Sequence, residues 1–195
     1  GPAEAPRAWA YPASVLPSAR SMSEEADVSA VTDPILDEVR RFYESHHEGL
    51  EASHRRHRYY YDYLTRILQV RVPPGQRVLD LGCGSGHLLA SLQPGQGVGI
   101  DISGPAIRTA RERHVSDSLR FIEGDATDPE VLAEAGGPFD VVLLVNVVTH
   151  LTDVQSALEA LQAVSHGQTR VLIYSYSRLW QPLLRLAEFL GMKYR

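Results

Sequence analysis

The residues of this chain that are best suited to chemistry follow short apolar runs at four places. They are Asp80 with Gly82, Gly84 and Gly86, then Asp101, then Asp125, and finally Asn146 with His150. Carboxylates accept hydrogen bonds from hydroxyl and amino groups, and glycines let the backbone turn sharply and approach a ligand. Histidine titrates near neutrality and can accept a proton. These residue types predict a polar site at the ends of strands.

The glycines lie in the stretch RVLDLGCGSGHLLASL, residues 77–92. An apolar run leads into three alternating glycines, and an apolar helical pattern resumes directly after them. A strand, a glycine turn and a helix in this order are typical of a nucleotide site. Dinucleotide folds use G-x-G-x-x-G, but here Gly86 comes one place early and His87 stands at the third glycine position. This spacing argues against an NAD-dependent oxidoreductase, which is kept as an alternative.

The pattern D-x-G-x-G-x-G, from Asp80 to Gly86, resembles the first motif of the class I S-adenosylmethionine-dependent methyltransferases. The resemblance continues at three further strand ends and covers roughly residues 78–177. It implies S-adenosylmethionine as the cofactor, S-adenosylhomocysteine as the product and methyl transfer as the activity. It also implies that Asp80 orients the methionine part through its amino group, while Gly82, Gly84 and Gly86 let the amino-acid chain pass.

The same resemblance implies roles for the residues at the later strand ends. Asp101 would accept the ribose hydroxyls, and Ile102 would flank the adenine. Asp125 would bind the adenine amino group, with Ala126 beside the ring, and Asn146 would face the methyl donor. Aspartate is also common in caps and turns, so each aspartate has a structural alternative.

Methyl transfer from a sulfonium mainly requires that donor and acceptor are aligned and that water is excluded. A base is needed only when the acceptor is a weak nucleophile such as a hydroxyl. His150, four residues after Asn146, is the candidate catalytic base. The alternative is a histidine at the surface or at a helix cap.

The elements that must position these residues follow from the apolar pattern. Five predicted strands alternate with short helices, which indicates βαβ units in an α/β, Rossmann-like, doubly wound and mainly parallel sheet with helices on both faces. The strands are expected at residues 77–82, 97–103, 119–125, 139–148 and 169–177, with helices at 87–92, 105–113, 129–135 and 154–164. A last helix is expected from residue 177 onward.

Three segments are expected along the chain: a flexible arm at residues 1–30, an N-terminal helical lid at 31–72, and the S-adenosylmethionine-binding domain at 73–195. In the family such lids cover the cofactor, and their tyrosines reach its carboxylate. The candidates here are Tyr43, Tyr59, Tyr60 and Tyr61, with Arg58 as a charged alternative. His47, His54, His57 and Tyr61 fall near one helical face, but they lack the carboxylate of a recognised motif, and no metal is expected.

Composition limits the function classes. The chain has 195 residues and a net charge of −5, so it lacks the basic excess of nucleic-acid binders. No apolar run approaches the roughly 20 residues that span a bilayer. With Cys83 as the only cysteine, a cytoplasmic, bacterial protein is expected. The acceptor is expected to be a small molecule or, because residues 170–193 resemble methyltransferase domains linked to glycosyltransfer, a glycan.

Class I methyltransferases carry two further strands after the last helix predicted here, and the sequence ends at Arg195 without them. The fifth strand would then have an open apolar edge. The explanations are a shortened form, which is favoured, a naturally short chain, or an edge completed by a homodimer or another partner chain. The alternative function is accordingly a methyltransferase-like module that binds the cofactor but needs a partner for catalysis, or lacks catalysis.

Overall fold

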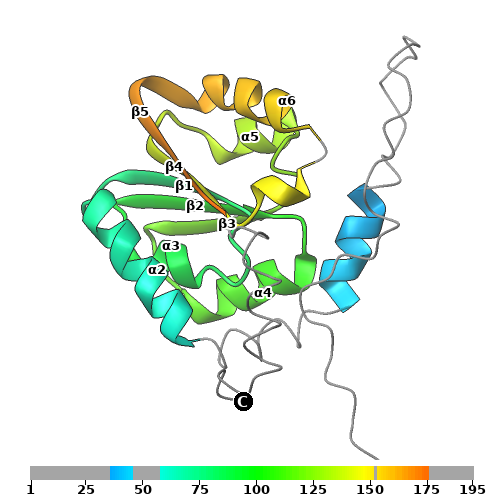
Figure 1. Ribbon diagram of the computed structural model, residues 1–195, viewed down its shortest axis with the longest axis horizontal. Coiled ribbons are helices and arrows are strands. Elements are labelled where there is room, and N and C mark those ends of the chain that lie inside the picture. Colours follow the sequence, from blue (N-terminus) through cyan, green and yellow to red (C-terminus); the bar gives the residue numbers. More distant parts are fainter. Residues whose placement is uncertain (1–35, 46–57, 152, 176–195) are drawn as a thin grey trace, which may run out of the picture.

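The computed structural model describes residues 36–45, 58–151 and 153–175. The described residues form a five-stranded sheet with the order β3-β2-β1-β4-β5, and every neighbouring pair is parallel (Figure 1). The strands are β1 Arg77–Leu81, β2 Gln96–Asp101, β3 Leu119–Glu123, β4 Phe139–Val145 and β5 Ser165–Tyr174. The predicted parallel α/β sheet is therefore confirmed.

Strand β1 lies at the centre of this sheet, at the point where the order of the strands reverses. Leu81, its last residue, is in register with Ile100 of β2 on one side and Leu144 of β4 on the other. The chain moves outward from β1 through β2 to β3 and then returns to β4. In open parallel sheets, ligands bind outside the carboxyl ends of the strands at such a switch point. The fold therefore predicts a ligand site beside the end of β1.

Helices cover both faces of the sheet (Figure 1). One face carries α2 Arg58–Arg71, α3 His87–Ser91 and α4 Gly104–Arg113, and the other carries α5 Pro129–Ala135, α6 Val154–Ala160 and the 3₁₀ helix η3 Leu161–Val164. Successive strand residues point to opposite faces, so Val78 joins one apolar core and Leu79 the other. The central strands β1 and β4 are consequently mainly apolar on both faces, and Asp80 is the charged residue at one of their buried positions, which requires a reason.

The strand boundaries differ most from the expected ones in β4 and β5. Strand β4 ends at Val145, three residues earlier than predicted, because Asn146 adopts a left-handed backbone conformation with φ 57° and turns the chain out of the sheet. Strand β5 begins at Ser165, and a register shift between Phe139 and Val141 absorbs its extra length. The predicted helix at 154–164 is split into α6 and η3.

The predicted lid is described only in part, as a helical segment at residues 36–45 and helix α2. In Figure 1 the segment 36–45 (blue) lies on the opposite side of the molecule from α2 (cyan). The predicted arm at 1–30, the histidines between 46 and 57, and the helix predicted after residue 177 lie outside the described residues. None of the described helices is long and apolar enough to cross a bilayer.

Candidate active site

The glycine turn connects β1 to α3 and requires glycine by its backbone geometry. Gly82, Gly84 and Gly86 have φ values of 72°, 55° and 74°, which are strained for residues with a Cβ. A Cβ on Gly86 would lie 2.6 Å from Cε1 of Phe121, whereas a Cβ on Gly84 would meet no atom within 4 Å. The backbone at Gly84 is therefore the open part of the turn, where a ligand has room to approach.

Asp101, at the end of β2, holds this turn in place. Its Oδ2 accepts a hydrogen bond from the backbone N–H of Gly84 at 2.8 Å, and its Oδ1 accepts one from the N–H of Ser103 at 2.9 Å. Asp101 therefore has a structural role in the turn. It does not cap α4, because the side chain of Ser103 caps that helix. Each carboxylate oxygen has a further lone pair. Asp101 can fix the turn and still accept a hydroxyl, so its expected role toward ribose remains a prediction.

Asp80 is a carboxyl group within the apolar layer, and it is only 1% exposed. Its Oδ2 has no hydrogen-bond partner among the residues that the structure describes. Burial, and secondarily the nearby Asp101 carboxylate, raise the pKa of Asp80 from 3.8 to about 8. A buried acceptor without a partner is costly, and such groups cluster at functional sites. Asp80 is therefore suited to a cationic ligand group, which would restore its ionised form.

This raised pKa predicts a specific pH dependence of stability. Between pH 4 and about 8, the folded protein retains a proton on Asp80 that the unfolded chain has lost. The stability that this raised pKa contributes is therefore complete below about pH 4 and is lost as pH rises toward 8. Between pH 5.5 and pH 8.5, the free energy of unfolding of the wild type, measured in urea, should fall by about 3 kcal/mol relative to that of Asp80→Asn, at about 1.4 kcal/mol per pH unit up to the raised pKa. Parallel pH profiles for the two proteins would show that Asp80 titrates normally.

Asn146 follows β4, the strand beside β1. Its backbone N–H donates to the carbonyl of Tyr174 at 2.7 Å, and its Nδ2 donates to the Tyr60 hydroxyl at 3.3 Å. Its buried Oδ1 has no partner among the described residues. Left-handed backbone at a non-glycine residue is strained, and such strain concentrates at functional sites. Two buried acceptor atoms that lack a partner in the described part of the chain, Oδ2 of Asp80 and Oδ1 of Asn146, thus lie near the ends of adjacent strands.

His150 is the last residue of η2, a 3₁₀ helix at Val148–His150. Its Nε2 lies 3.2 Å from the hydroxyl oxygen of Tyr43. The two rings are perpendicular, with an interplanar angle of 89° and centroids 5.7 Å apart. The candidate base is therefore in direct contact with the helical segment 36–45, which the sequence placed in the lid.

The remaining predicted cofactor residues lie in the loops after β2 and β3. Ile102 directly follows β2 and is half-buried. The Oδ1 of Asp125 accepts a hydrogen bond from the N–H of Thr127 at 2.8 Å, and Ala126 packs against an apolar core. The predicted cofactor residues therefore all lie near or just after the carboxyl ends of strands β1 to β4. Their roles toward a ligand stay predictions.

Of the tyrosines predicted for the lid, Tyr59 and Tyr60 lie in different environments. Tyr59 is 85% exposed. Tyr60 packs against the core and contacts both Asn146 and the ring of Tyr174, whose centroid is 6.5 Å away. Sequence reasoning missed Tyr174, although its position as the last residue of an apolar strand was the available signal. In residues 36–45, 58–151 and 153–175, no group of three potential metal ligands occurs.

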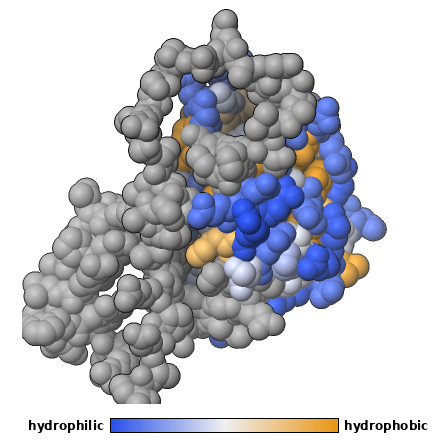
Figure 2. All heavy atoms as spheres, turned by 90° about the vertical axis from the view of Figure 1, so that its right-hand side faces the viewer, coloured by the Kyte–Doolittle hydropathy of each residue, from blue (hydrophilic) through white to orange (hydrophobic). Residues whose placement is uncertain are grey.

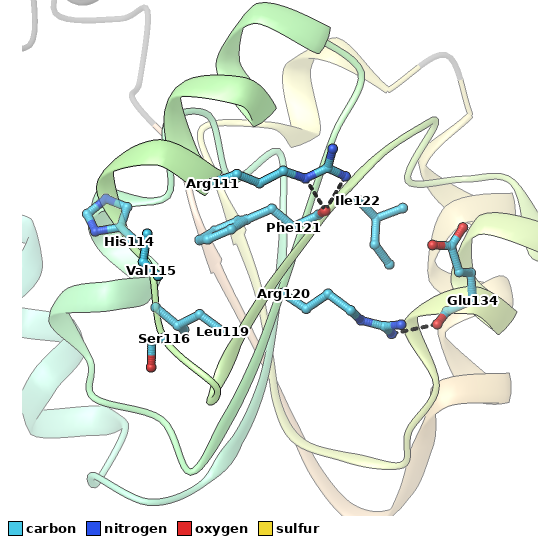
Figure 3. Close-up of a pocket in the computed structure, with 9 residues that line it drawn as sticks. All are labelled: Arg111, His114, Val115, Ser116, Leu119, Arg120, Phe121, Ile122 and Glu134. Atoms are coloured by element: carbon cyan, nitrogen blue, oxygen red, sulfur yellow. Dashed lines mark hydrogen bonds between the residues drawn. The ribbon is translucent and has the colours of Figure 1, made fainter.

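A hollow at the edge of the sheet lies beside β3, and none of its lining residues is a predicted cofactor residue (Figure 3). Its lining residues are Arg111, His114, Val115, Ser116, Leu119, Arg120, Phe121, Ile122 and Glu134. The guanidinium of Arg111 donates to the carbonyl of Phe121 at 3.1 and 2.6 Å, and Arg120 donates to the carbonyls of Glu134 and Ala135. Arg111 thus binds a backbone carbonyl of strand β3, whereas Arg120 binds two carbonyls at the end of helix α5, where basic side chains are favourable.

Comparison with known proteins agrees with this geometry. Residues 73–190, well over half of the chain, match a protein family described as "Methyltransferase domain". The chain belongs to the class I S-adenosylmethionine-dependent methyltransferases. Ubiquinone biosynthesis O-methyltransferase from Brucella ovis is 41% identical over 92 residues, which cover 46% of this chain and 37% of that protein. The same enzyme from Caulobacter sp. is 40% identical over 82 residues, covering 40% of this chain and 32% of that protein.

The methyltransferase chain thus spans less than two-fifths of the length of these relatives. Solved structures share its fold. CalS10 of Micromonospora echinaspora, an amino pentose methyltransferase, has a TM-score of 0.55 at 22% identity and covers 66% of this chain and 56% of its own. A complex of the Trm112 activator and a methyltransferase from Haloferax volcanii gives a TM-score of 0.55 at 22% identity. The match covers 82% of this chain and 68% of that chain. The cofactor of the family is S-adenosylmethionine, and two features fit it: the glycine turn and the Asp80 carboxyl, whose Oδ2 has no partner among the described residues.

Proposed function

We propose that this protein transfers a methyl group from S-adenosylmethionine to a hydroxyl oxygen of a small-molecule or sugar acceptor. The observation that carries the proposal is Asp80, a buried carboxyl whose Oδ2 has no partner among the described residues, directly before an open glycine turn. Such a group matches the ammonium of the cofactor's methionine part. The names of the relatives, O-methyltransferases, support oxygen as the accepting atom.

When bound, S-adenosylmethionine supplies a methyl group that its sulfonium already activates. Asp80 would bind the amino group, Asp101 the ribose and Asp125 the adenine, with apolar contact from Ile102 and Ala126. Asn146, with a buried acceptor oxygen at the end of β4, would line the methyl side. His150 would take up the proton of the acceptor hydroxyl, since a hydroxyl is a weak nucleophile until it loses that proton.

The activity is tested with labelled S-adenosylmethionine and three probe acceptors: catechol, methyl glucoside and benzylamine. The proposal predicts that S-adenosylhomocysteine and a methylated product accumulate with a hydroxyl probe. A second prediction is that His150→Gln loses at least about a hundredfold in rate, the usual contribution of a general base. Methylation of the amine alone, or a His150→Gln protein with unchanged rate, would contradict the proposed acceptor or base.

The second candidate is a module that binds the cofactor and works with a partner chain. It is favoured by β5, an edge strand of the described sheet, on which Val171 and Ile173 are 41% and 52% exposed. Exposed β-branched residues on an edge strand favour pairing with another chain, whether a second copy or a different protein. Light scattering on the purified chain distinguishes the two candidates, since a monomer with full activity needs no partner.

A further inference from the structure

The residues after β4 are joined to both described N-terminal helical segments by tyrosine hydroxyls. The Tyr60 hydroxyl of α2 accepts from Asn146 at 3.3 Å, and the Tyr43 hydroxyl of segment 36–45 lies 3.2 Å from His150 Nε2. These contacts join residues 86 and 107 positions apart. Figure 2 looks onto the side of the molecule where segment 36–45 lies in Figure 1. It shows hydrophilic residues gathered there, with hydrophobic ones between them.

The contact between Tyr43 and His150 has a chemical consequence for the proposed base. A neutral imidazole has one acceptor nitrogen, and this nitrogen has a single lone pair. The donor in this pair depends on the histidine tautomer. With Tyr43 as the donor, Nε2 is the acceptor nitrogen and the ring proton lies on Nδ1. While this bond exists, the hydroxyl of a methyl acceptor cannot bond to Nε2 directly. It can reach His150 only through the oxygen of Tyr43.

We propose that Tyr43 and His150 form a proton relay, in which Tyr43 contacts the methyl acceptor and His150 receives the proton through Tyr43. The O–H bond of the acceptor breaks, and its proton passes to the Tyr43 oxygen as the proton of Tyr43 passes to Nε2. The oxygen of the acceptor bonds to the methyl group, and the sulfur that held this group keeps the electron pair. His150 is left as an imidazolium, which returns its proton to water. The relay rests on the proposed function and refines it.

The ring of Tyr43 is held for this role on two sides. His150 packs against it at 89°, and the ring of Phe42 packs at 88° with centroids 5.5 Å apart. Perpendicular aromatic pairs of this kind are favourable and orient both rings. An aligned hydroxyl and imidazole form the arrangement by which a base activates a neighbouring group. The relay makes segment 36–45 part of the acceptor site.

Nuclear magnetic resonance of protein labelled with ¹⁵N-histidine tests the contact without any acceptor. His150 is assigned by its absence in His150→Gln. In the wild type, Nε2 should be unprotonated and Nδ1 protonated, and Tyr43→Phe should give a mixture of both tautomers. Tyr63→Phe, which alters a tyrosine 54% exposed on α2, serves as the control and should leave the spectrum unchanged. An identical His150 spectrum in wild type and Tyr43→Phe would overturn the relay.

A double-mutant cycle tests the relay in turnover of catechol. Tyr43→Phe, His150→Gln and the double variant should lose rate by the same factor, at least about a hundredfold, because each removes the same proton path. Binding of S-adenosylhomocysteine should remain within about twofold. Additive losses, or a Tyr43→Phe protein with unchanged rate, would overturn the relay. Failure of the wild type to bind S-adenosylhomocysteine would instead refute the proposed function.

Discussion

Replacing Asp80 with asparagine is expected to weaken the binding of S-adenosylhomocysteine at least about a hundredfold. Asparagine has nearly the same shape but cannot carry the charge that the ammonium of the ligand requires. Removing one partner of a buried ion pair costs about 3–5 kcal/mol, which corresponds to more than a hundredfold in affinity. The substitution should leave the free protein folded, because the raised pKa of about 8 keeps Asp80 protonated near neutrality. Equilibrium dialysis with labelled ligand measures the loss.

The matched control for this prediction is Asp117→Asn, which removes one negative charge from an exposed loop far from β1 in the sequence. Its affinity should equal that of the wild type, which excludes a general effect of net charge. If Asp80→Asn bound the ligand as tightly as the wild type, Asp80 would have no part in binding. The buried carboxyl would then need another explanation.

Replacing Gly86 with alanine is expected to destabilise the fold by about 2–5 kcal/mol. Two costs add at this position. The φ of 74° costs about 1–2 kcal/mol for a residue with a Cβ. In addition, the Cβ would lie 2.6 and 2.7 Å from two ring atoms of Phe121, which is only 4% exposed, and overpacking of this kind costs about 1–3 kcal/mol. Urea unfolding followed by circular dichroism gives the change in free energy.

Gly75→Ala separates these two costs. Gly75 has a similar φ of 83°, but a Cβ there would meet no atom within 4 Å. The free energy of unfolding of Gly75→Ala should therefore fall only by the backbone cost of about 1–2 kcal/mol. Equal losses at Gly75 and Gly86 would mean that Phe121 moves aside without cost and that the turn is not tightly packed against β3.

The order of strands and helices could be predicted because the apolar runs and the glycine turn are local signals. The end of β4 could not. VVLLVNVV continues as an apolar run beyond Asn146, and nothing in it announces the left-handed backbone that turns the chain there. That turn depends on the contact of the Asn146 N–H with the carbonyl of Tyr174 in another strand. A local sequence pattern does not predict such long-range contacts.

For the candidate site, the sequence indicated which residues meet at the sheet edge but not how each is bonded. In the sequence, Asp80 and Asp101 are both carboxylates at the ends of predicted strands. In the structure Asp101 binds two backbone N–H groups, whereas Asp80 is buried and its Oδ2 lacks a described partner. The contact of Tyr43 with His150 was equally out of reach, because 107 positions separate the two residues.

The central claim is that Asp80 and the glycine turn hold the amino-acid part of S-adenosylmethionine. Calorimetric titration of the wild type with S-adenosylhomocysteine at pH 7, in two buffers of different ionisation enthalpy, tests it most directly. The account predicts one ligand per chain and release of close to one proton, because Asp80 becomes ionised when it meets the ammonium. Absence of binding at millimolar concentration, or binding that releases no proton, would contradict it.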